Sequence, residues 1–536
     1  MSGRWGTVGA ARQVLVVART VTSLNRALDV LAVFADDLRV QVSFVVSRGS
    51  RFGAEVPRVL EELGARVIDW QQAVDERFDL VISASDHADL HELRGPLALF
   101  SHGAGFMKYS PHNDPTADER AGLTGAALWH EGHGVPHLLG LSHENQRELL
   151  GELADRAHVI GDPTLDSMML LAERRDILRG QLGLSPTQRL VTLTSTWGPR
   201  SLLARRPTLP AQLLAELPWD EYRVAAVLHP NIWAAHGPWQ IRHWLRTALS
   251  SGLILLPPAG PWQIGLAAAD CVIGDHGSLS AYAAGLSRPL MLAAFGEEEV
   301  PRDTAMWRLS RRVPQLNPRL ALAAQVRHAI DHVELDVLRE AADDVFSEQG
   351  RSLGLLQRHL YDVLGLEPQY RPTPRDVPEW QTAPEPSAFH AVVAEVNGSD
   401  GRAVSVERFP AALLRLARPG LAHHLVARRD ADEVTLQNAA AIITAGAEPG
   451  AAAQTLSRYP GCRLAVEGTA EAVVLTERDG TRIRVTGLEG PPPAAWTAAS
   501  VWIHLRARTP GGARGALGDV QIAVGRARGR SRILLE

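Results

Sequence analysis

Short apolar runs alternate with stretches of helical hydrophobic spacing from residue 13 to residue 100. An apolar run bounded by turn residues is typical of a strand buried on both faces, whereas apolar residues about 3.6 positions apart are typical of an amphipathic helix. Strands that alternate with helices predict a parallel sheet covered on both faces. The predicted strands are residues 13–18, 40–46, 66–68, 78–83 and 97–100, and the predicted helices include residues 24–38 and 54–63.

The same alternation starts again at residue 190, which predicts a second parallel sheet. Its most regular part is Pro261–Phe295, where the pattern predicts a helix, a strand, a loop, a second helix and a second strand. We therefore expect an α/β protein with two Rossmann-like, doubly wound domains over residues 1–165 and 166–366. The other predicted strands of the second domain are residues 190–194, 222–228 and 252–256.

The last third of the chain lacks this alternation. Residues 367–388 are rich in proline, arginine and glutamate, a composition typical of a linker. Residues 389–536 contain separate apolar runs and no chemical motif, so we expect a small C-terminal α+β domain. The sequence does not indicate the role of this domain, and we expect that it could contact a protein partner.

Composition narrows the class of protein. The 536 residues have a formal net charge of -5, and their arginines are spread along the chain, which argues against a nucleic-acid partner. Only two cysteines are present, Cys271 and Cys462, so a disulfide framework is not expected. Apolar runs stay below the roughly 18 residues of a membrane span, and we expect a cytoplasmic protein without a transmembrane segment.

The loop inside Pro261–Phe295 is the first candidate site. It reads GDHGS over residues 274–278 and opens a helix, so backbone N–H groups and the positive end of the helix dipole meet there. Such a loop suits a phosphate group, and ligands of open α/β sheets bind beyond the carboxyl ends of the strands. No G-x-G-x-x-G follows the first strand, so the dinucleotide-binding fingerprint is absent.

The segment after strand 97–100 is the second candidate. His102 follows this strand directly, and Lys108 is the only lysine among 55 basic residues. A lysine offers a compact ammonium whose pKa can move, which a guanidinium does not. The two alternatives are a histidine that hydrogen-bonds its own loop and a lysine left by codon bias.

Two further loops carry groups that suit an anion. Thr196 and Arg200 follow strand 190–194, and His229 follows strand 222–228. Ordinary polar turns remain the alternative for both loops.

Three histidines reproduce the spacing of a metzincin zinc protease. They are His133, His137 and His143, but Gly134 stands where the catalytic glutamate should follow the first histidine. Pro136 would also disturb the helix that such a site requires. We therefore expect no metal there.

Together these segments resemble the CDP-glycerol glycerophosphotransferases, the family that polymerises teichoic acids. That family has two Rossmann-like domains facing a cleft in the GT-B arrangement, and the resemblance covers roughly residues 13–365. The segments that carry it are the His-Gly segment with its downstream Lys (101–108), the turn from Ser-Thr to Arg after a strand (195–200), the His-Pro pair (229–230), the Ala-rich helix with its Asp loop and Arg-Pro (266–289), and the Gly-Asp-Pro turn with its downstream Asp (161–166).

The resemblance implies a transferase that moves a glycerophosphate or glycosyl group from a nucleotide-diphosphate donor to a hydroxyl acceptor, without metal or cofactor. The acceptor would be a cell-wall or glycan precursor, and a peripheral position at the inner membrane face is then an alternative to a free cytoplasmic one. His102 would be the general base, with Lys108 beside it, because a base with a pKa near neutrality is efficient. The implied donor-binding residues are Thr196, Arg200, His229, Asp275, His276, Gly277 and Ser278.

Two other functions stay open. The acidic run 297–299, followed by Arg302, faintly resembles the carboxyl-terminal signature of UDP-N-acetylglucosamine 2-epimerases, which share the two-domain cleft. Gly277 stands in place of the first serine of the glycerophosphotransferase hallmark, which favours a third function, a nucleotide-binding regulatory protein without catalysis.

Overall fold

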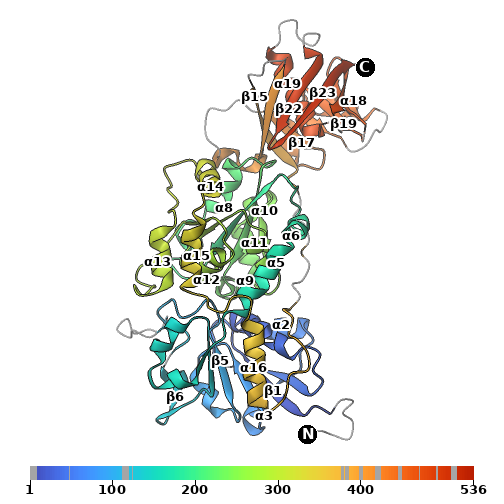
Figure 1. The fold of residues 1–536 in the computed structure, drawn as a ribbon. Coiled ribbons are helices and arrows are strands. Elements are labelled where there is room, and N and C mark those ends of the chain that lie inside the picture. The colour runs from blue at the N-terminus through green and yellow to red at the C-terminus, as the bar shows by residue number, and fades with distance from the viewer. Residues whose placement is uncertain are drawn as a thin grey trace.

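A computed structural model describes most of the chain (Figure 1). Three bodies follow one another along a line, with the first α/β domain at one end, the second in the middle and the C-terminal domain at the other end. Part of the predicted linker lies outside the described residues. The described residues are 9–47, 49–110, 120–123, 125–375, 380, 385–396, 402–416, 424–444, 450–469, 471–489, 493–508 and 516–536.

The first domain is built on a seven-stranded parallel sheet with the order β3-β2-β1-β4-β5-β8-β9. Strands β4 and β5 are buried along their whole length because helices cover both faces of the sheet. The strands are β1 (Arg12–Ala18), β2 (Val40–Val46), β3 (Val67–Ile68), β4 (Leu80–Ser83), β5 (Leu97–Phe100), β8 (Leu138–Leu141) and β9 (Ala157–Val159).

Strand β8 corrects the sequence analysis, which assigned no strand to this stretch. Gly140 allows the close packing of β8 on β5, because a Cβ atom there would lie 2.3 Å from Cδ1 of Phe100. The smaller elements nearby are α4 (Gly125–Leu128), β6 (Trp129–His130), β7 (His133–Gly134) and the 3-10 helix η3 (Glu144–Arg156).

One helix of the second half of the chain belongs to the core of the first domain. Leu356 and Leu360 of helix α16 (Ser352–Leu364) belong to the same buried core as apolar side chains of β1 and α1, and the helix lies along the first domain (Figure 1). The helices that surround this sheet are α1 (Val21–Leu31), η1 (Ala32–Phe34), α2 (Val56–Glu62), α3 (Trp70–Asp75), η2 (Ala88–Glu92) and α16.

The second domain has a five-stranded parallel sheet with the order β12-β11-β10-β13-β14. Strand β11 has the limits that the sequence predicts, because all seven of its residues are buried. The strands are β10 (Arg189–Ser195), β11 (Tyr222–Leu228), β12 (Ile254–Leu256), β13 (Cys271–Gly274) and β14 (Leu290–Leu292).

Helices cover both faces of this second sheet and connect it to the first domain. Helix α5 (Pro163–Glu173) leads from β9 into the second domain, and α16 returns to the first. The remaining helices are α6 (Arg175–Gln181), α7 (Leu202–Arg205), α8 (Leu209–Glu216), α9 (Pro230–Trp244), α10 (Arg246–Ser250), α11 (Trp262–Ala267), α12 (Ser278–Gly285), α13 (Ala305–Arg312), α14 (Leu322–Asp331) and α15 (Leu335–Asp343).

The C-terminal domain is a closed barrel of nine strands, a feature that the predicted α+β class did not specify. Both parallel and antiparallel pairs occur among its strands. The strands in barrel order are β15 (Ala388–Glu395), β16 (Ala403–Pro410), β22 (Gly518–Val524), β23 (Ala527–Leu535), β21 (Arg482–Glu489), β20 (Val473–Glu477), β19 (Leu464–Gly468), β18 (Ala441–Ile443) and β17 (His424–Arg428).

Helix α19 (Ala495–Arg508) fills the interior of this barrel. Its residues from Trp496 to Leu505 are all buried, which is typical of a helix enclosed on every side. The side chains of Trp502 and Phe389 are fully buried in the core that α19 forms with the strands. The other helices of the domain are η4 (Ala411–Leu416), α17 (Glu433–Asn438) and α18 (Ala451–Arg458).

Candidate functional site

The loop that follows β5 forms the first wall of the candidate site. The carbonyl of Gly103 accepts hydrogen bonds from the Ser101 hydroxyl at 2.6 Å and from the Gly105 N–H at 2.8 Å. These bonds fold the loop back on itself and leave the side chain of His102 exposed. The carboxyl end of β5 thus presents an imidazole, as the sequence predicts.

The loop between β13 and α12 forms the second wall, and Asp275 anchors it. This carboxylate is only 1% exposed and accepts hydrogen bonds from the N–H groups of Thr196 at 2.9 Å, Leu202 at 2.7 Å and Gly277 at 3.0 Å. Backbone N–H groups satisfy the buried charge, so Asp275 ties the loop after β10 to the start of α12. In this arrangement the aspartate orients the loop rather than facing a ligand.

The two walls touch each other. A Cβ atom placed on Gly103 would lie 2.7 Å from Oγ of Ser278, the first residue of α12. The ammonium of Lys108 donates to the Thr196 hydroxyl at 2.8 Å, and the N–H of Tyr109 donates to the Glu299 carbonyl at 3.0 Å. The structure therefore brings the two candidate segments, which meet through Gly103 and Ser278, into contact at the junction of the two domains, and this junction is called the crevice.

His229 lies at the same crevice, at the carboxyl end of β11. Its Nδ1 accepts a hydrogen bond from the N–H of Asn231 at 3.1 Å, so His229 caps α9 and its other nitrogen carries the proton. Burial, together with the charges of Lys108 and the nearby His102, lowers the pKa of His229 to about 3. His229 is thus uncharged at neutral pH and can offer an anion an N–H group but no positive charge.

His276 is placed beneath the loop rather than on its surface. Its side chain is inaccessible to solvent, its Nδ1 accepts from the N–H of Gly296 at 3.2 Å, and its Nε2 lies 2.7 Å from Oε2 of Glu299. Both ring nitrogens therefore have protein partners. The carboxylate of Glu299 and the side chain of Arg200, which pairs with Glu298, lie closer to the surface.

Burial lowers the pKa of two side chains at the crevice, and nearby charges modify the effect. The protein packed around His102 lowers its pKa. The positive charges of Arg26 and Lys108 lower this pKa as well, whereas the negative charge of Asp86 acts to raise it. Burial also lowers the pKa of Lys108, whereas Asp275 and Glu299 act to raise it.

Burial acts to raise the pKa of Glu299. The hydrogen bond from His276 and the charges of His276, Lys108 and Arg200 outweigh burial and hold this pKa below its usual value. The crevice thus combines an imidazole with a carboxylate that is ionised at neutral pH.

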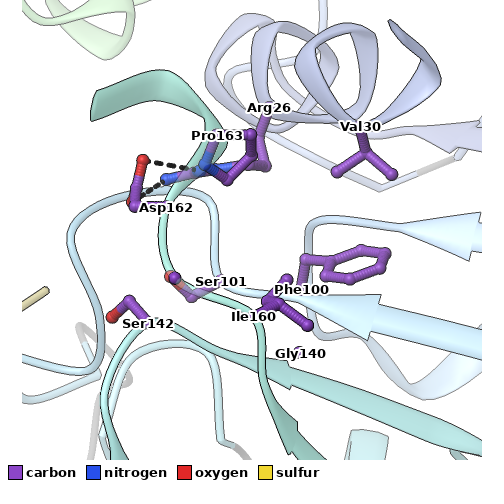
Figure 2. A pocket seen from close by; sticks show the side chains of 10 residues that line it. Arg26, Val30, Phe100, Ser101, Gly140, Ser142, Ile160, Asp162 and Pro163 are labelled. Atoms are coloured by element: carbon purple, nitrogen blue, oxygen red, sulfur yellow. Dashed lines mark hydrogen bonds and ion pairs between the residues drawn. The ribbon is translucent and has the colours of Figure 1, made fainter. Parts of the chain in front are cut away.

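The sequence analysis missed a buried cluster beside the His102 loop. Arg26 of α1 donates to both carboxylate oxygens of Asp162, which caps α5, at 3.0 and 2.7 Å (Figure 2). The same guanidinium donates to the carbonyl of Gly103 at 3.1 Å and to the hydroxyl of Tyr282 in α12 at 2.8 Å. An arginine on a helix gives no sequence signal for burial, whereas the Gly-Asp-Pro turn had already drawn attention to Asp162.

A small cavity lies under this cluster, at the carboxyl ends of β5, β8 and β9 (Figure 2). Its volume is about 10 Å³, which is room for one water molecule and not for a nucleotide. The residues that line it include Arg26, Phe100, Ser101, Ser142, Ile160 and Asp162.

Asp166, one turn beyond Asp162, has a separate structural partner. Its carboxylate accepts hydrogen bonds from the N–H groups of Gly350 at 2.7 Å and Ser352 at 2.9 Å. The side chain of Arg351 does not cap α16, so the carboxylate of Asp166 caps this helix instead. Asp166 thereby joins the two helices that connect the domains.

The three histidines with zinc-protease spacing lie on different elements. His133 is in β7, His137 precedes β8, and His143 caps η3 with its Nδ1. The helix that this spacing requires is therefore not formed. Across the part of the chain that the structure describes, no three His, Cys, Asp or Glu side chains gather as a metal site, and no helix is long and apolar enough to cross a membrane.

The two facing Rossmann-like sheets and the crevice between them define a GT-B-like fold. The chain is similar to a variant of the wall teichoic acid polymerase TagF with CDPG, with a TM-score of 0.48 and 12% identity over 67% of this chain and 90% of that one. It is also similar to MnaA of S. aureus with UDP, with a TM-score of 0.41 and 12% identity over 68% of this chain and all of the other.

A third similar structure is the UDP-GlcNAc 2-epimerase of Neisseria meningitidis bound to UDP-GlcNAc, with a TM-score of 0.39 and 12% identity over 66% of this chain and 99% of that one. No protein-family model matches the sequence, and no curated protein matches it. These similarities concern the fold, so the reaction has to be argued from the crevice itself.

Proposed function

We propose that this chain is a GT-B-type transferase. It moves a glycerophosphate or glycosyl group from a nucleotide-diphosphate donor to a hydroxyl acceptor. The observation that carries the proposal is the contact between the two walls, where Gly103, next to His102, lies against Ser278 at the start of α12. A base and an anion-binding helix start therefore share one crevice.

His102 acts as the general base. Its ring is exposed in the crevice and its pKa is lowered by the surrounding protein, so it is neutral at physiological pH and ready to accept a proton. Transfer of the acceptor proton to a positioned base accelerates such reactions by roughly 10²–10⁴-fold. In glycerophosphate transfer the hydroxyl oxygen bonds to the phosphorus of the glycerophosphate, the P–O–P bond of the donor breaks, and a nucleoside monophosphate leaves. In glycosyl transfer the oxygen bonds to the anomeric carbon, the carbon–oxygen bond to the pyrophosphate breaks, and a nucleoside diphosphate leaves.

The start of α12 holds the pyrophosphate. Gly277 caps this helix without a side chain, so the N–H groups of the first turn and the positive end of the helix dipole are directed at the crevice. A side chain at Gly277 would be tight, because a Cβ atom there would lie 3.1 Å from both Asp275 and Thr196. Packing against these two residues thus favours glycine at position 277, and the missing side chain also leaves the backbone N–H groups open to a ligand.

Two further groups stabilise the charge that develops on the leaving phosphate. Lys108 supplies an ammonium within reach of Thr196, and His229 supplies a neutral N–H donor. Arg200, half-exposed and paired with Glu298, adds a cation at the rim of the site. Because Gly103 covers Ser278 in this arrangement, the donor reaches α12 only after the two walls have separated.

A screen of nucleotide-linked donors tests this function. Thermal unfolding of the full chain with CDP-, UDP-, GDP- and ADP-linked compounds identifies the donor, since a ligand at 100 times its Kd stabilises the folded state by about 2.7 kcal/mol. Donor turnover is then compared between His102→Ala and His332→Ala, an exposed histidine of the second domain. We expect His102→Ala to abolish transfer and keep nucleotide binding, and equal turnover in both variants removes His102 from the mechanism.

A second candidate function is an isomerase of the UDP-N-acetylglucosamine 2-epimerase kind. The observation that favours it is Glu299, a carboxylate near Lys108 whose pKa is held low, so a second base is present. Release of free UDP through a 2-acetamidoglucal intermediate without any acceptor supports the isomerase, whereas an absolute need for an acceptor supports the transferase. Nucleotide binding without turnover of any donor supports a regulatory protein instead.

A further inference from the structure

Arg26 lies where four segments of the chain meet. Its guanidinium contacts Asp162 at the start of α5, Gly103 in the His102 loop and Tyr282 in α12, and Arg26 itself belongs to α1. The hydroxyl of Tyr282 also donates to Asp162 at 3.0 Å, which closes the cluster. One side chain of the first domain therefore joins the His102 loop to the helix that begins with Ser278.

The cluster is buried and its charge is balanced. The exposed fractions are 5% for Arg26 and 2% for both Asp162 and Tyr282. Burial by itself lowers the pKa of Arg26, but the adjacent Asp162 and its neighbours hold this pKa above its ordinary value, so the guanidinium stays charged. A buried ion pair is favourable only when further hydrogen bonds satisfy its atoms, and Gly103 and Tyr282 supply them.

The Gly103 carbonyl is the point where Arg26 meets the candidate site. This oxygen also accepts from Ser101 and Gly105, so three donors fix its position. Gly103 is the residue after His102 and the residue that touches Ser278. A shift of this carbonyl therefore changes the separation between the base and the start of α12.

We propose that Arg26 is a positioning residue, which fixes the His102 loop against α12 through Gly103 and Tyr282 and so sets the closed geometry of the crevice. The effect of Arg26 on catalysis rests on the proposed function, in which His102 is the general base. Arg26 is buried and bonds the residue next to His102, so it acts through the position of His102.

A second arginine of the chain makes the comparison that the test needs. Arg408 forms a similar buried fork with Asp220 between the barrel and the second domain, with Nε and Oδ2 2.8 Å apart. Arg408 belongs to the barrel, which lies at the opposite end of the molecule from the first domain and its His102 loop (Figure 1). Arg408→Lys is therefore the matched control for Arg26→Lys, because both variants keep a positive charge and lose the planar fork.

The first experiment measures how often the two walls meet, without any need for a substrate. In Gly103→Cys/Ser278→Cys protein the Cβ atoms would lie about as far apart as the 3.4 Å measured between a Cβ on Gly103 and Cβ of Ser278, close to the range of disulfides. The two native cysteines are buried and do not compete. The rate of disulfide formation in this background reports the closed geometry.

We expect Arg26→Lys to slow this disulfide formation about tenfold, the scale of one lost charge-assisted hydrogen bond. Tyr282→Phe, which removes only the hydroxyl, slows it a few-fold. Arg408→Lys leaves the rate unchanged. Equal rates in Arg26→Lys and Arg408→Lys overturn the proposal, and should Arg26→Lys fail to fold, the Tyr282→Phe rate decides in its place.

The second experiment follows the titration of His102 by NMR in histidine-labelled protein. The charged and titratable groups that act on His102 are Asp86, Arg26 and Lys108, with His229 across the crevice. Arg26→Gln removes a cation and raises the pKa of His102, whereas Arg26→Lys and Arg408→Gln leave it near the wild-type value. A purely structural role for Arg26 predicts the same titration in all folded variants, which contradicts the proposal.

These two readouts keep the proposal separate from the proposed function. If no donor is turned over by the wild-type protein, the transferase assignment fails while the disulfide rates and the titration still decide the position of the loop. If transfer occurs and Arg26→Lys leaves the disulfide rate at the wild-type value, the transferase stands and the positioning role of Arg26 is wrong.

Discussion

The second domain makes two interfaces with the rest of the chain, and polar and apolar contacts contribute differently to them. Toward the first domain, hydrogen bonds such as that of Lys108 with Thr196 accompany the buried side chain of Met107. Toward the barrel, the fork between Arg408 and Asp220 accompanies Trp219, a larger apolar side chain that joins the barrel core 5.5 Å from the ring of Phe389.

This difference in chemistry indicates a difference in mobility. Polar contacts at a crevice can exchange with water and with a charged ligand, so they separate at modest cost. A buried tryptophan removes a large apolar area from water and loses that gain whenever the interface opens. We therefore expect Trp219 to hold the barrel to the second domain, and on the proposed function the crevice between the two sheets is the interface that would open for a donor.

The largest expected effect lies at the barrel. Trp219→Ala removes an indole that is 6% exposed, and such truncations cost about 3–5 kcal/mol. Calorimetry of the full chain should show the barrel transition at a lower temperature, while donor turnover remains.

Trp239→Ala is the control for this change, because the Trp239 side chain is 71% exposed. It should shift unfolding by less than about 0.5 kcal/mol, as surface substitutions do. A loss of donor turnover in Trp219→Ala that accompanies an unchanged barrel transition would mean that the barrel takes part in the reaction.

A smaller effect is expected at the crevice. Thr196→Val keeps the shape of the side chain but leaves the Lys108 ammonium without its partner at 2.8 Å, so donor affinity should fall about tenfold. In Lys108→Arg the donor affinity should fall by a similar factor, because a planar guanidinium does not replace a compact ammonium in this desolvated site. Isothermal titration with the identified donor measures both, and full affinity in Lys108→Arg would contradict the account.

The smallest effect concerns pH. A general base acts when it is unprotonated, so kcat/KM should rise with pH along a limb whose midpoint lies below 6.5, the usual pKa of histidine, because the pKa of His102 is lowered. Asp86 acts to raise that pKa, so Asp86→Asn should move the limb to lower pH. A shift to higher pH in Asp86→Asn would assign the limb to another group.

The sequence predicts the two sheets well because their strands are local signals. Residues 40–46, 97–100 and 222–228 form strands with the predicted limits, since uninterrupted apolar runs suit strands buried on both faces. Strand β8 escaped prediction because it is short, contains Gly140 and lies between histidines whose spacing suggested another kind of site.

Contacts between distant residues are what the sequence does not reveal. The barrel closes through pairs such as β16 with β22, whose partners are separated by more than 100 positions, and no local pattern selects them. Arg26 meets Asp162 from 136 positions away, so its burial depends on the folded domains. The candidate loops had a local sequence signal, whereas the residues that hold these loops together had none. His276, which the sequence analysis assigned to donor binding, is buried against Glu299.

The most direct test of the account is a disulfide between the walls of the crevice. Mild oxidation of the full chain with Gly103→Cys and Ser278→Cys should give an intramolecular disulfide, because a Cβ on Gly103 would lie 3.4 Å from Cβ of Ser278. The Gly354→Cys/Ser278→Cys pair serves as the control, since no side chain or backbone atom lies within 4 Å of a Cβ on Gly354. Rapid cross-linking of the first pair alone is the predicted result, and two free thiols after oxidation would contradict a shared crevice.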